Sequence, residues 1–354
     1  MEISAQLVKK LRDMTDAGMM DCKKALIETK GEIEKAIEYL REKGLSKAAK
    51  KADRIASEGI VSVKVASDFQ KASLLEINSE TDFVAKNDTF KNLVEKSSML
   101  VFDSALSDIS TLHTKEIDGV KFEEYLQQNI AKIGENIVIR RLETIQVAGN
   151  AVVNGYVHSN GRVGVLIAMT YKKETSKAKA ADLARNLCMH AAAMKPQVLS
   201  YTDLDSEFIK KEKIVLIAEL TKENEEFKRL GKPLHKIPKY ISRSELTQEV
   251  LSQAKADFEA ELKAQGKPEA IWNKIIPGQI ERFIADNTLI DQRLTLLGQF
   301  FVMDDKKTIA QVLKAKGEEL NDELEIIKYV RFELGEGIEK KTEDFAAEVA
   351  SQMQ

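Results

Sequence analysis

The sequence has little cysteine, and its cysteines are dispersed. Cys22 and Cys188 are the only two in 354 residues, and neither belongs to a C-x-x-C pair or lies near a histidine. This spacing indicates neither a disulfide framework nor a zinc site. We interpret both thiols as small, buried, apolar side chains.

Long apolar runs are also missing. No stretch approaches the ~20 consecutive apolar residues that a membrane-spanning helix needs, and the first residues lack the basic and then apolar order of a targeting peptide. We therefore expect a cytoplasmic protein. Neither sign of charge predominates, with 54 basic and 57 acidic side chains, so no overall field favours nucleic acid or anionic lipid. A protein or small-molecule partner is the better expectation.

Motifs for nucleotide binding and catalysis are absent as well. The chain has no G-x-x-x-x-G-K-[ST] loop, and "LGEG" does not complete G-x-G-x-x-G. The four histidines are widely separated and match no H-E-x-x-H or nucleophile-and-base spacing; they are His113, His158, His190 and His235. We therefore expect no cofactor, no metal ligands and no catalytic residue, and an enzyme is the weaker hypothesis.

The first 55 residues predict a small unit of three short helices. Apolar residues recur at helical spacing from Leu7 to Met14, again in "MDCKKALIETKG", and again in "GEIEKAIEYLREKG". The connection "TDAGMMDC" places Met19 and Met20 beside a glycine, in an expected turn. Two interpretations stay open for this pair: packing in the core, or display on a binding surface, which flexible and polarizable side chains suit.

From Gly59 the pattern changes to strands. "GIVSVKVA" and "KASLLEINSE" predict an antiparallel hairpin, followed by one helix from Asp82 toward Ser104. "VVNGYVHSNGRVGVLIAMTY" and the segment after it repeat this order, with an Asn160-Gly161 turn. The sequence therefore predicts an α+β core of two related halves, and not a doubly wound parallel sheet. The residues expected to face inward are Phe90, Leu93, Val94, Ser97 and Val101 in the first helix and Ala180, Leu183, Leu187 and Ala191 in the second.

A third region, residues 196–267, is rich in charge and helix formers. Its two charged segments flank "KPLHKIPKYI", in which Pro233 and Pro238 oppose a continuous helix. We predict an antiparallel, coiled-coil-like helical hairpin with a bent tip, with compact structure resuming near Gly266. "YVRFELGEG" should return a strand to the second half, before an acidic amphipathic tail. The predicted domains are 1–55, helical; 56–140, first half of the core; 141–195 with 268–337, second half; 196–267, arm; and 338–354, tail.

The stretch "NSETDFVAKND" places Asp82 beside Phe83 where a helix is expected to begin. Taken alone, it reads as an ordinary helix start. Ser79 or Thr81 would cap the helix, Asp82 would be favoured in its first turn, and Phe83 would staple the helix to the core. This interpretation gives the stretch a structural role only.

Seven segments, spread along nearly the full chain, stand out by their sequence and by their order. They are "LRDMTDAGMMDCKKAL", "IASEG", "ETDFVAKND", "KIGENIVIRR", "YVHSNGRVGVL", "MHAAAMKP" and "VRFELGEGIEKKTEDFAAEV". Together they resemble the signature segments of the elongation factor Ts family. The resemblance implies a guanine-nucleotide exchange factor for elongation factor Tu, the GTPase that delivers aminoacyl-tRNA to the ribosome, acting by binding and without covalent catalysis. It also implies that the first domain is similar to a ubiquitin-associated (UBA) three-helix domain.

The resemblance implies roles for individual residues. "TDFV" is the family's element for dislodging magnesium from the partner: Phe83 would wedge partner side chains apart, and Asp82 would either alter the electrostatics near the metal or only orient the ring. The first domain would contact the GTPase domain, His158 would contact a different partner domain, and the tail would add a contact. The implied residues are Thr81, Asp82, Phe83 and Val84 for magnesium dislocation, and Arg12, Met19, Met20, Lys23, Ile133, Gly134 and His158 for partner binding.

Two features depart from the family pattern. Asp16 stands in "TDAG" where the family usually has T-G-A-G, and the helical arm is longer than in common short members. Two other classes of protein also stay open. Scattered basic segments would suit an accessory protein that binds RNA in a strongly salt-dependent way, and a small-molecule enzyme would need residues that only the fold brings together.

Overall fold

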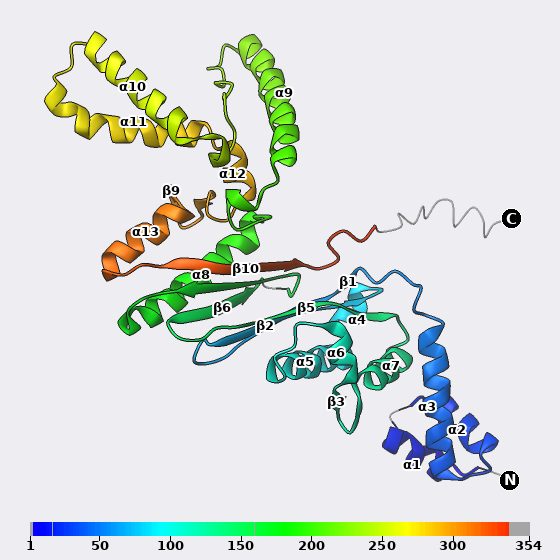
Figure 1. The fold of residues 1–354 in the computed structure, drawn as a ribbon. Helices are drawn as coiled ribbons and strands as arrows, with labels where there is room; N and C mark the ends of the chain where they lie inside the picture. Colours follow the sequence, from blue (N-terminus) through cyan, green and yellow to red (C-terminus); the bar gives the residue numbers. More distant parts are fainter. Residues whose placement is uncertain (1–2, 16, 159, 340–354) are drawn as a thin grey trace. The chain divides into compact units, whose positions relative to one another are not determined.

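The computed structural model describes residues 3–15, 17–158 and 160–339 (Figure 1). Contacts between residues divide the chain into two compact units. The first comprises Met1–Met169, Lys177–Ala192 and Val330–Gln354, and the second comprises Thr170–Ser176 and Ala193–Tyr329. Within the described ranges, no helix is long and apolar enough to cross a membrane. Asp16 and residues 340–354 of the predicted tail (338–354) lie outside the described residues.

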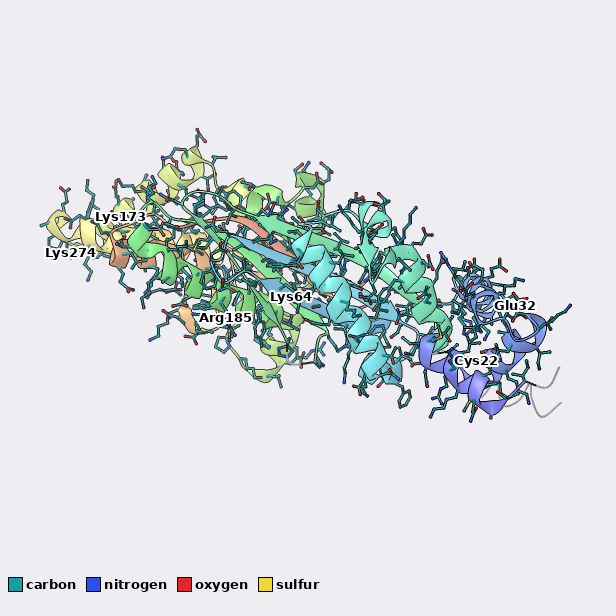
Figure 2. The ribbon with its side chains drawn as sticks, turned by 90° about the horizontal axis from the view of Figure 1, so that it is seen from below. Cys22, Glu32, Lys64, Lys173, Arg185 and Lys274 are labelled. Carbon is teal, nitrogen blue, oxygen red and sulfur yellow. The ribbon has the colours of Figure 1, made fainter. Side chains whose placement is uncertain are left out.

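Three helices begin the first unit, as the sequence predicts: α1 (Ala5–Thr15), α2 (Met19–Glu28) and α3 (Ile33–Ala49). Cys22, labelled in Figure 2, is fully buried among them, as expected. The position of the methionine pair was predicted wrongly. The turn ends at Gly18, so Met19 and Met20 lie in the first turn of α2. The small core is formed by Val8, Leu11, Cys22, Ala25, Leu26 and Ala36.

The first sheet contains β1 (Glu58–Val65), β2 (Lys71–Ser79) and β5 (Ile137–Gln146), in the antiparallel order β1-β2-β5. The predicted hairpin is therefore confirmed. Apolar residues from β2 and β5 form one core with residues of α5 (Asp88–Asp103), α6 (Ile109–Thr114) and α7 (Phe122–Ile133). A small hairpin of β3 (Glu116–Ile117) and β4 (Val120–Lys121) precedes α7.

The single helix expected from Asp82 toward Ser104 is two helices, α4 (Asp82–Lys86) and α5. The break is at Asn87, whose backbone is extended (φ −71°, ψ 137°). Its side chain accepts a hydrogen bond from the Thr89 N–H at 2.8 Å and so caps α5. The inward stripe predicted for this helix is confirmed, because all five of its residues are buried.

The second sheet repeats the arrangement of the first. Its strands β6 (Ala151–Val157), β7 (Val163–Thr170) and β10 (Glu325–Glu333) lie in the order β10-β7-β6, so that a hairpin is again completed by a strand from later in the chain. The helix α8 (Lys177–Met194) buries the four residues predicted to face inward. Its backbone is tied to β6, since the Asn154 side chain donates to the Ala181 carbonyl at 2.9 Å.

The two sheets stack face to face in the first unit (Figure 1). The layer between them is apolar and includes Val61, Leu74 and Ile145 from the first sheet with Val153, Leu166 and Phe332 from the second. Two glycines allow the close approach. A Cβ atom on Gly155 would lie 2.7 Å from Val63 Cγ1, and one on Gly164 would lie 2.6 Å from Val61 Cγ1. Helices therefore cover only the outer face of the first sheet.

The second unit is mostly helical. It contains α9 (Ser206–Leu230), α10 (Gln248–Ala264), α11 (Trp272–Asp286), α12 (Leu289–Leu294) and α13 (Ile309–Leu320). A hairpin of β8 (Phe300–Phe301) and β9 (Asp304–Thr308) precedes α13. The short 3₁₀ turns of this unit are Glu174–Ser176, Tyr201–Asp203, Arg243–Glu245 and Glu269–Ile271.

The arm differs from the predicted hairpin of residues 196–267. The partner of α10 is α11, and the Phe258 and Phe283 rings meet edge to face with centroids 6.4 Å apart. The helix α9 is followed instead by an extended segment that returns along it: Asn224 exchanges two hydrogen bonds with the backbone of His235, at 2.6 and 2.8 Å. Gly231 (φ 66°) ends α9, and the prolines that follow keep the chain extended. Helical structure thus continues past Gly266.

Candidate functional site

The helix α4 begins with a cap that is itself held from outside. The Thr81 hydroxyl oxygen accepts a hydrogen bond from the Val84 N–H at 3.3 Å. The same hydroxyl donates to Glu135 at 2.7 Å, and the Thr81 backbone N–H donates to the other oxygen of that carboxylate at 3.0 Å. Of the two caps that the sequence allowed, Thr81 is the one used, and Ser79 donates to the Thr81 carbonyl at 3.0 Å.

The Phe83 side chain points away from the protein. It is 78% exposed, whereas the next two residues, Val84 and Ala85, pack against the core of the first sheet. The interpretation of Phe83 as a staple to the core is therefore wrong. Leaving an aromatic side chain in water forgoes about 1.5–3 kcal/mol of burial free energy, so the ring contributes little to the stability of its own domain.

The Asp82 carboxylate forms an ion pair with Lys86, one helical turn later, at 2.7 Å. The hydrogen bond from Lys86 lowers the pKa of Asp82 below its ordinary value of 3.8. The Lys86 ammonium also lies 5.8 Å from the centroid of the Phe83 ring. Since Thr81 provides the cap, Asp82 does not fix the start of the helix. The two charges together form a neutral pair beside the exposed ring.

Ile133 and Gly134 are brought to this segment by the residue that follows them. Gly134 ends α7 with a left-handed conformation (φ 91°), and a Cβ atom there would meet nothing within 4 Å. Ile133 is partly buried against the core of the first sheet. Glu135, next in the chain, makes the two hydrogen bonds to Thr81. The fold thus joins the "TDFV" and "KIGENI" segments.

A second acid near Thr81 connects the site to the linker that follows α3. Glu80 accepts a hydrogen bond from the Asn136 N–H at 2.5 Å and forms an ion pair with Arg54 at 3.5 Å. The Asn136 side chain donates to the Arg54 carbonyl at 2.7 Å, and Lys51 donates to the Gly134 carbonyl. Sequence reasoning missed Glu80 and Glu135, although each stands inside a quoted segment, directly beside predicted site residues.

The predicted contact residues of the first domain are all on its surface. Met19 is 52% exposed and Met20 is 75% exposed, so the interpretation of this pair as core is wrong. Arg12 on α1 and Lys23 on α2 are exposed as well. A cluster of exposed methionines is unusual for a side chain that fills cores well, and it is typical of binding surfaces.

His158 lies in the turn between β6 and β7 and is exposed. Its backbone N–H donates to the Val163 carbonyl at 2.9 Å, and its carbonyl accepts from the Gly161 N–H at 2.8 Å, so the predicted turn is confirmed. The Gly161 carbonyl in turn accepts from the Val61 N–H on β1 at 2.7 Å. These hydrogen bonds hold His158 on its own hairpin and β1.

Comparison with known proteins gives one consistent result. The family described as "Elongation factor TS" matches residues 80–237 and 234–336. Elongation factor Ts of Helicobacter hepaticus is 75% identical over 353 residues, covering 100% of this chain and 99% of the relative. Those of Wolinella succinogenes and Helicobacter pylori are 75% and 62% identical, each covering 99% of both chains. The chain therefore belongs to the elongation factor Ts family, whose members act in the elongation step of translation.

Proposed function

We propose that the chain is a guanine-nucleotide exchange factor for elongation factor Tu. In this role it speeds GDP release by disturbing the site that holds Mg²⁺ and the phosphates, and it acts in the cytoplasm by binding alone, without a cofactor. The observation that supports the proposal best is the exposed Phe83 ring on a helix whose start Thr81 and Glu135 hold in place. Exposed aromatic side chains that become buried in a complex often dominate its binding energy.

The ring acts as a wedge in this proposal. Its helix is already formed and capped, so little ordering is needed when the partner binds. Burying the ring in the partner gains about 1.5–3 kcal/mol, and this gain is realised only when the partner's side chains have moved apart. Because about 1.4 kcal/mol corresponds to a tenfold change in an equilibrium constant, the wedge alone shifts the partner markedly toward its open state.

Asp82 contributes charge to the same segment. In the free chain its carboxylate is neutralised by Lys86. We infer that the pair opens when Phe83 enters the partner, so that the carboxylate faces the Mg²⁺ site and the ammonium group faces the phosphates. Thr81 and Val84 complete the segment, Thr81 as its cap and Val84 as its attachment to the core.

The remaining predicted residues supply affinity. We infer that the three-helix domain is UBA-like and contacts the GTPase domain through Arg12, Met19, Met20 and Lys23. Ile133 and Gly134 add contacts beside the wedge. His158 contacts another domain of the partner, and the tail from residue 338 adds a further contact.

Exchange follows from linkage between the two ligands of the GTPase. If this chain binds the nucleotide-free GTPase more tightly than the GDP-bound one, then GDP must weaken its binding by the same factor. The chain lowers the barrier for release and for rebinding alike. GTP then replaces GDP through its concentration and later capture, and the chain need not select between the two nucleotides.

The test is a stopped-flow measurement of labelled GDP leaving purified elongation factor Tu, with excess unlabelled nucleotide, in the presence and absence of this chain. We expect the release rate to rise with the concentration of the chain and then to saturate. A release rate that does not change at any concentration contradicts the proposal. Release that depends on added RNA would point to the RNA-binding class instead.

A further inference from the structure

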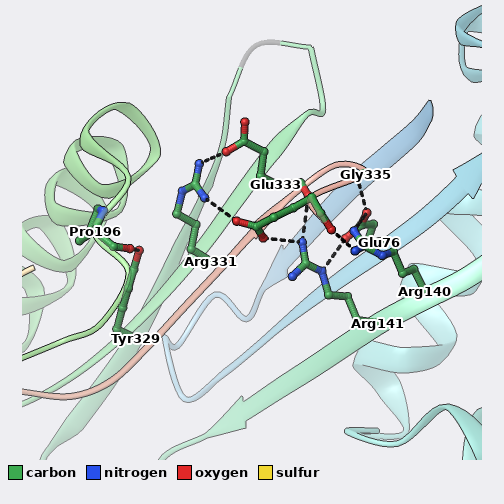
Figure 3. A network of polar contacts seen from close by, with 9 residues as sticks. Glu76, Arg140, Arg141, Pro196, Tyr329, Arg331, Glu333 and Gly335 are labelled. Atoms are coloured by element: carbon green, nitrogen blue, oxygen red, sulfur yellow. Dashed lines mark hydrogen bonds and ion pairs between the residues drawn. The ribbon is translucent and has the colours of Figure 1, made fainter. Parts of the chain in front are cut away.

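A buried carboxylate lies in the layer between the two sheets, away from the wedge. Glu76, on β2, is fully buried and lies on the same face of the strand as Leu74. It accepts hydrogen bonds from three donors: Arg140 Nη1 at 2.9 Å, Arg141 Nε at 2.5 Å and the Gly335 backbone N–H at 2.9 Å (Figure 3). Two of these donors come from β5, and the third comes from the chain just after β10.

A β-bulge makes this arrangement possible. Glu76 pairs with Arg141 while the next residue, Ile77, pairs with Ile139, so Arg140 is the extra residue in β5. Consecutive side chains of a regular strand point to opposite faces, but a bulge redirects one of them. Both arginines therefore reach the same carboxylate.

The arginines also hold the chain that follows β10. Arg141 Nη2 donates to the Glu333 carbonyl at 2.9 Å and pairs with the Glu336 carboxylate at 3.2 Å. Arg140 donates to the Glu336 carbonyl. The Arg141 guanidinium lies 4.3 Å from the centroid of the Phe332 ring. Directly or through its two arginines, Glu76 is thus connected to Glu333, Gly335 and Glu336 of the turn after β10.

The turn is fixed by close packing as well. Gly335 has φ +70°, and a Cβ atom on it would lie 2.4 Å from the Ser57 carbonyl oxygen, so no other residue fits there without movement. The Leu334 side chain is buried, and its N–H donates to the Arg162 carbonyl at 2.8 Å. Ser57 directly precedes β1. The chain entering the first sheet and the chain leaving toward the tail therefore touch at one point.

Stability alone does not explain the buried acid. Apolar residues of similar volume often serve as well as, or better than, a buried ion pair. Unlike an apolar side chain, the carboxylate forms directional hydrogen bonds. These require the Gly335 N–H and both guanidinium groups to lie in defined positions. We propose that Glu76, acting through Arg140 and Arg141, is a positioning residue that sets the direction in which the tail leaves the core and so presents the tail to the GTPase. The second half of this statement rests on the proposed function.

The exit direction can be measured in the full-length chain. Spin labels at Asp103→Cys and Glu339→Cys, both exposed positions of the first unit, report the distance from α5 to the chain just past the turn, and both native thiols are buried. We expect Arg141→Lys to broaden the distance distribution and Glu336→Gln to broaden it less. Because Glu336 is half exposed, we expect Glu336→Gln to fold normally, and it serves as the test variant if Arg141→Lys folds poorly. Arg293→Lys, which makes the same change at an exposed ion pair with Glu219 in the second unit, is the control. Unchanged distributions in both test variants overturn the proposal.

The link to the tail is tested by a double-mutant cycle on GDP release. Phe345→Ala alters the tail, and Arg141→Lys alters its exit. We expect each change to raise the half-saturating concentration of the chain by about three- to tenfold, because a misdirected tail has a lower effective concentration at its contact. The double variant should be no worse than Phe345→Ala alone, since both changes remove one contact.

Two outcomes separate this proposal from its alternatives. If the increases in half-saturating concentration multiply in the double variant, Arg141 acts independently of the tail, as a general loss of stability would also do. That result overturns the positioning role. If the wild-type chain does not speed GDP release at all, the proposed function fails, and the spin-label distances then decide whether Glu76 and its two arginines set the direction in which the tail leaves the core.

Discussion

Glu135 accepts two hydrogen bonds from Thr81, one from its backbone N–H at 3.0 Å and one from its hydroxyl at 2.7 Å. Thr81 caps the helix that displays Phe83, and Glu135 directly follows Gly134, which ends α7. The carboxylate therefore fastens the helix that carries Phe83, the proposed wedge, to the end of α7, which belongs to the core of the first sheet. A ring on a fastened helix keeps its direction, which a ring on a free loop does not.

Removing this carboxylate should loosen the wedge and leave the rest of the domain in place. For Glu135→Ala we expect a loss of about 1 kcal/mol in the free energy of unfolding. We also expect a lower maximal rate of GDP release at a saturating concentration of the chain. Denaturant unfolding and stopped-flow release measure the two effects. Glu123→Ala, an exposed acid in the first turn of α7, is the matched control. A normal maximal rate for Glu135→Ala would show that the wedge needs no such fastening.

Phe83→Ala should separate function from stability. Because the ring is 78% exposed, we expect the free energy of unfolding to change by less than about 0.5 kcal/mol. The stimulated release of GDP should slow by about tenfold or more, since the burial energy of the ring is lost in the open complex. Met99→Ala, an exposed apolar residue on α5, is the control. Equal release rates for Phe83→Ala and wild type exclude the wedge.

Much of the core could be predicted because periodicity reports which face of an element is buried. The two hairpins, the stripe from Phe90 to Val101 and the inward face of α8 all follow from spacing alone. The break at Asn87 does not, because a capping residue inside a continuous apolar stripe resembles a helix interior. The pairing of α10 with α11 was missed for a similar reason, since charged helices of similar pattern do not show which of them pack together.

The candidate contact residues were found in a different way. Motifs supplied the positions of Phe83 and Met20, and only the structure shows that both are exposed. Glu135 and Glu76 act through residues 54 or more positions away in the sequence, and no local pattern marks such pairs. The bulge at Arg140 is equally invisible in "KIGENIVIRR", where two adjacent arginines suggest opposite faces of a regular strand.

Met20→Ala should weaken the complex and leave the folded chain intact. The side chain is 75% exposed and lies in the first turn of α2, so its truncation removes contact area in the complex and little in the free domain. We expect the dissociation constant for nucleotide-free elongation factor Tu to rise by about five- to thirtyfold, corresponding to about 1–2 kcal/mol. Calorimetric titration measures it, with Ile214→Ala on α9 as an exposed apolar control. An unchanged dissociation constant removes Met20 from the interface.

The pair of Asp82 and Lys86 predicts a specific titration. Because the hydrogen bond from Lys86 lowers the pKa of Asp82 in the folded chain, the ionised carboxylate favours the folded state above the ordinary value of 3.8. That contribution is lost as the pH falls through the lowered pKa. This contribution to stability is small, since both side chains are at least half exposed.

We expect the Asp82 carboxyl carbon, followed by nuclear magnetic resonance, to titrate with a midpoint below pH 3.8. In Lys86→Met the midpoint should move toward that value. Lys91→Met, which removes the partner of Asp88 on the neighbouring helix, should leave the Asp82 midpoint in place. A wild-type midpoint at or above 3.8, or one that ignores Lys86→Met, would mean that the pair is not formed in solution and that the carboxylate faces the partner unneutralised.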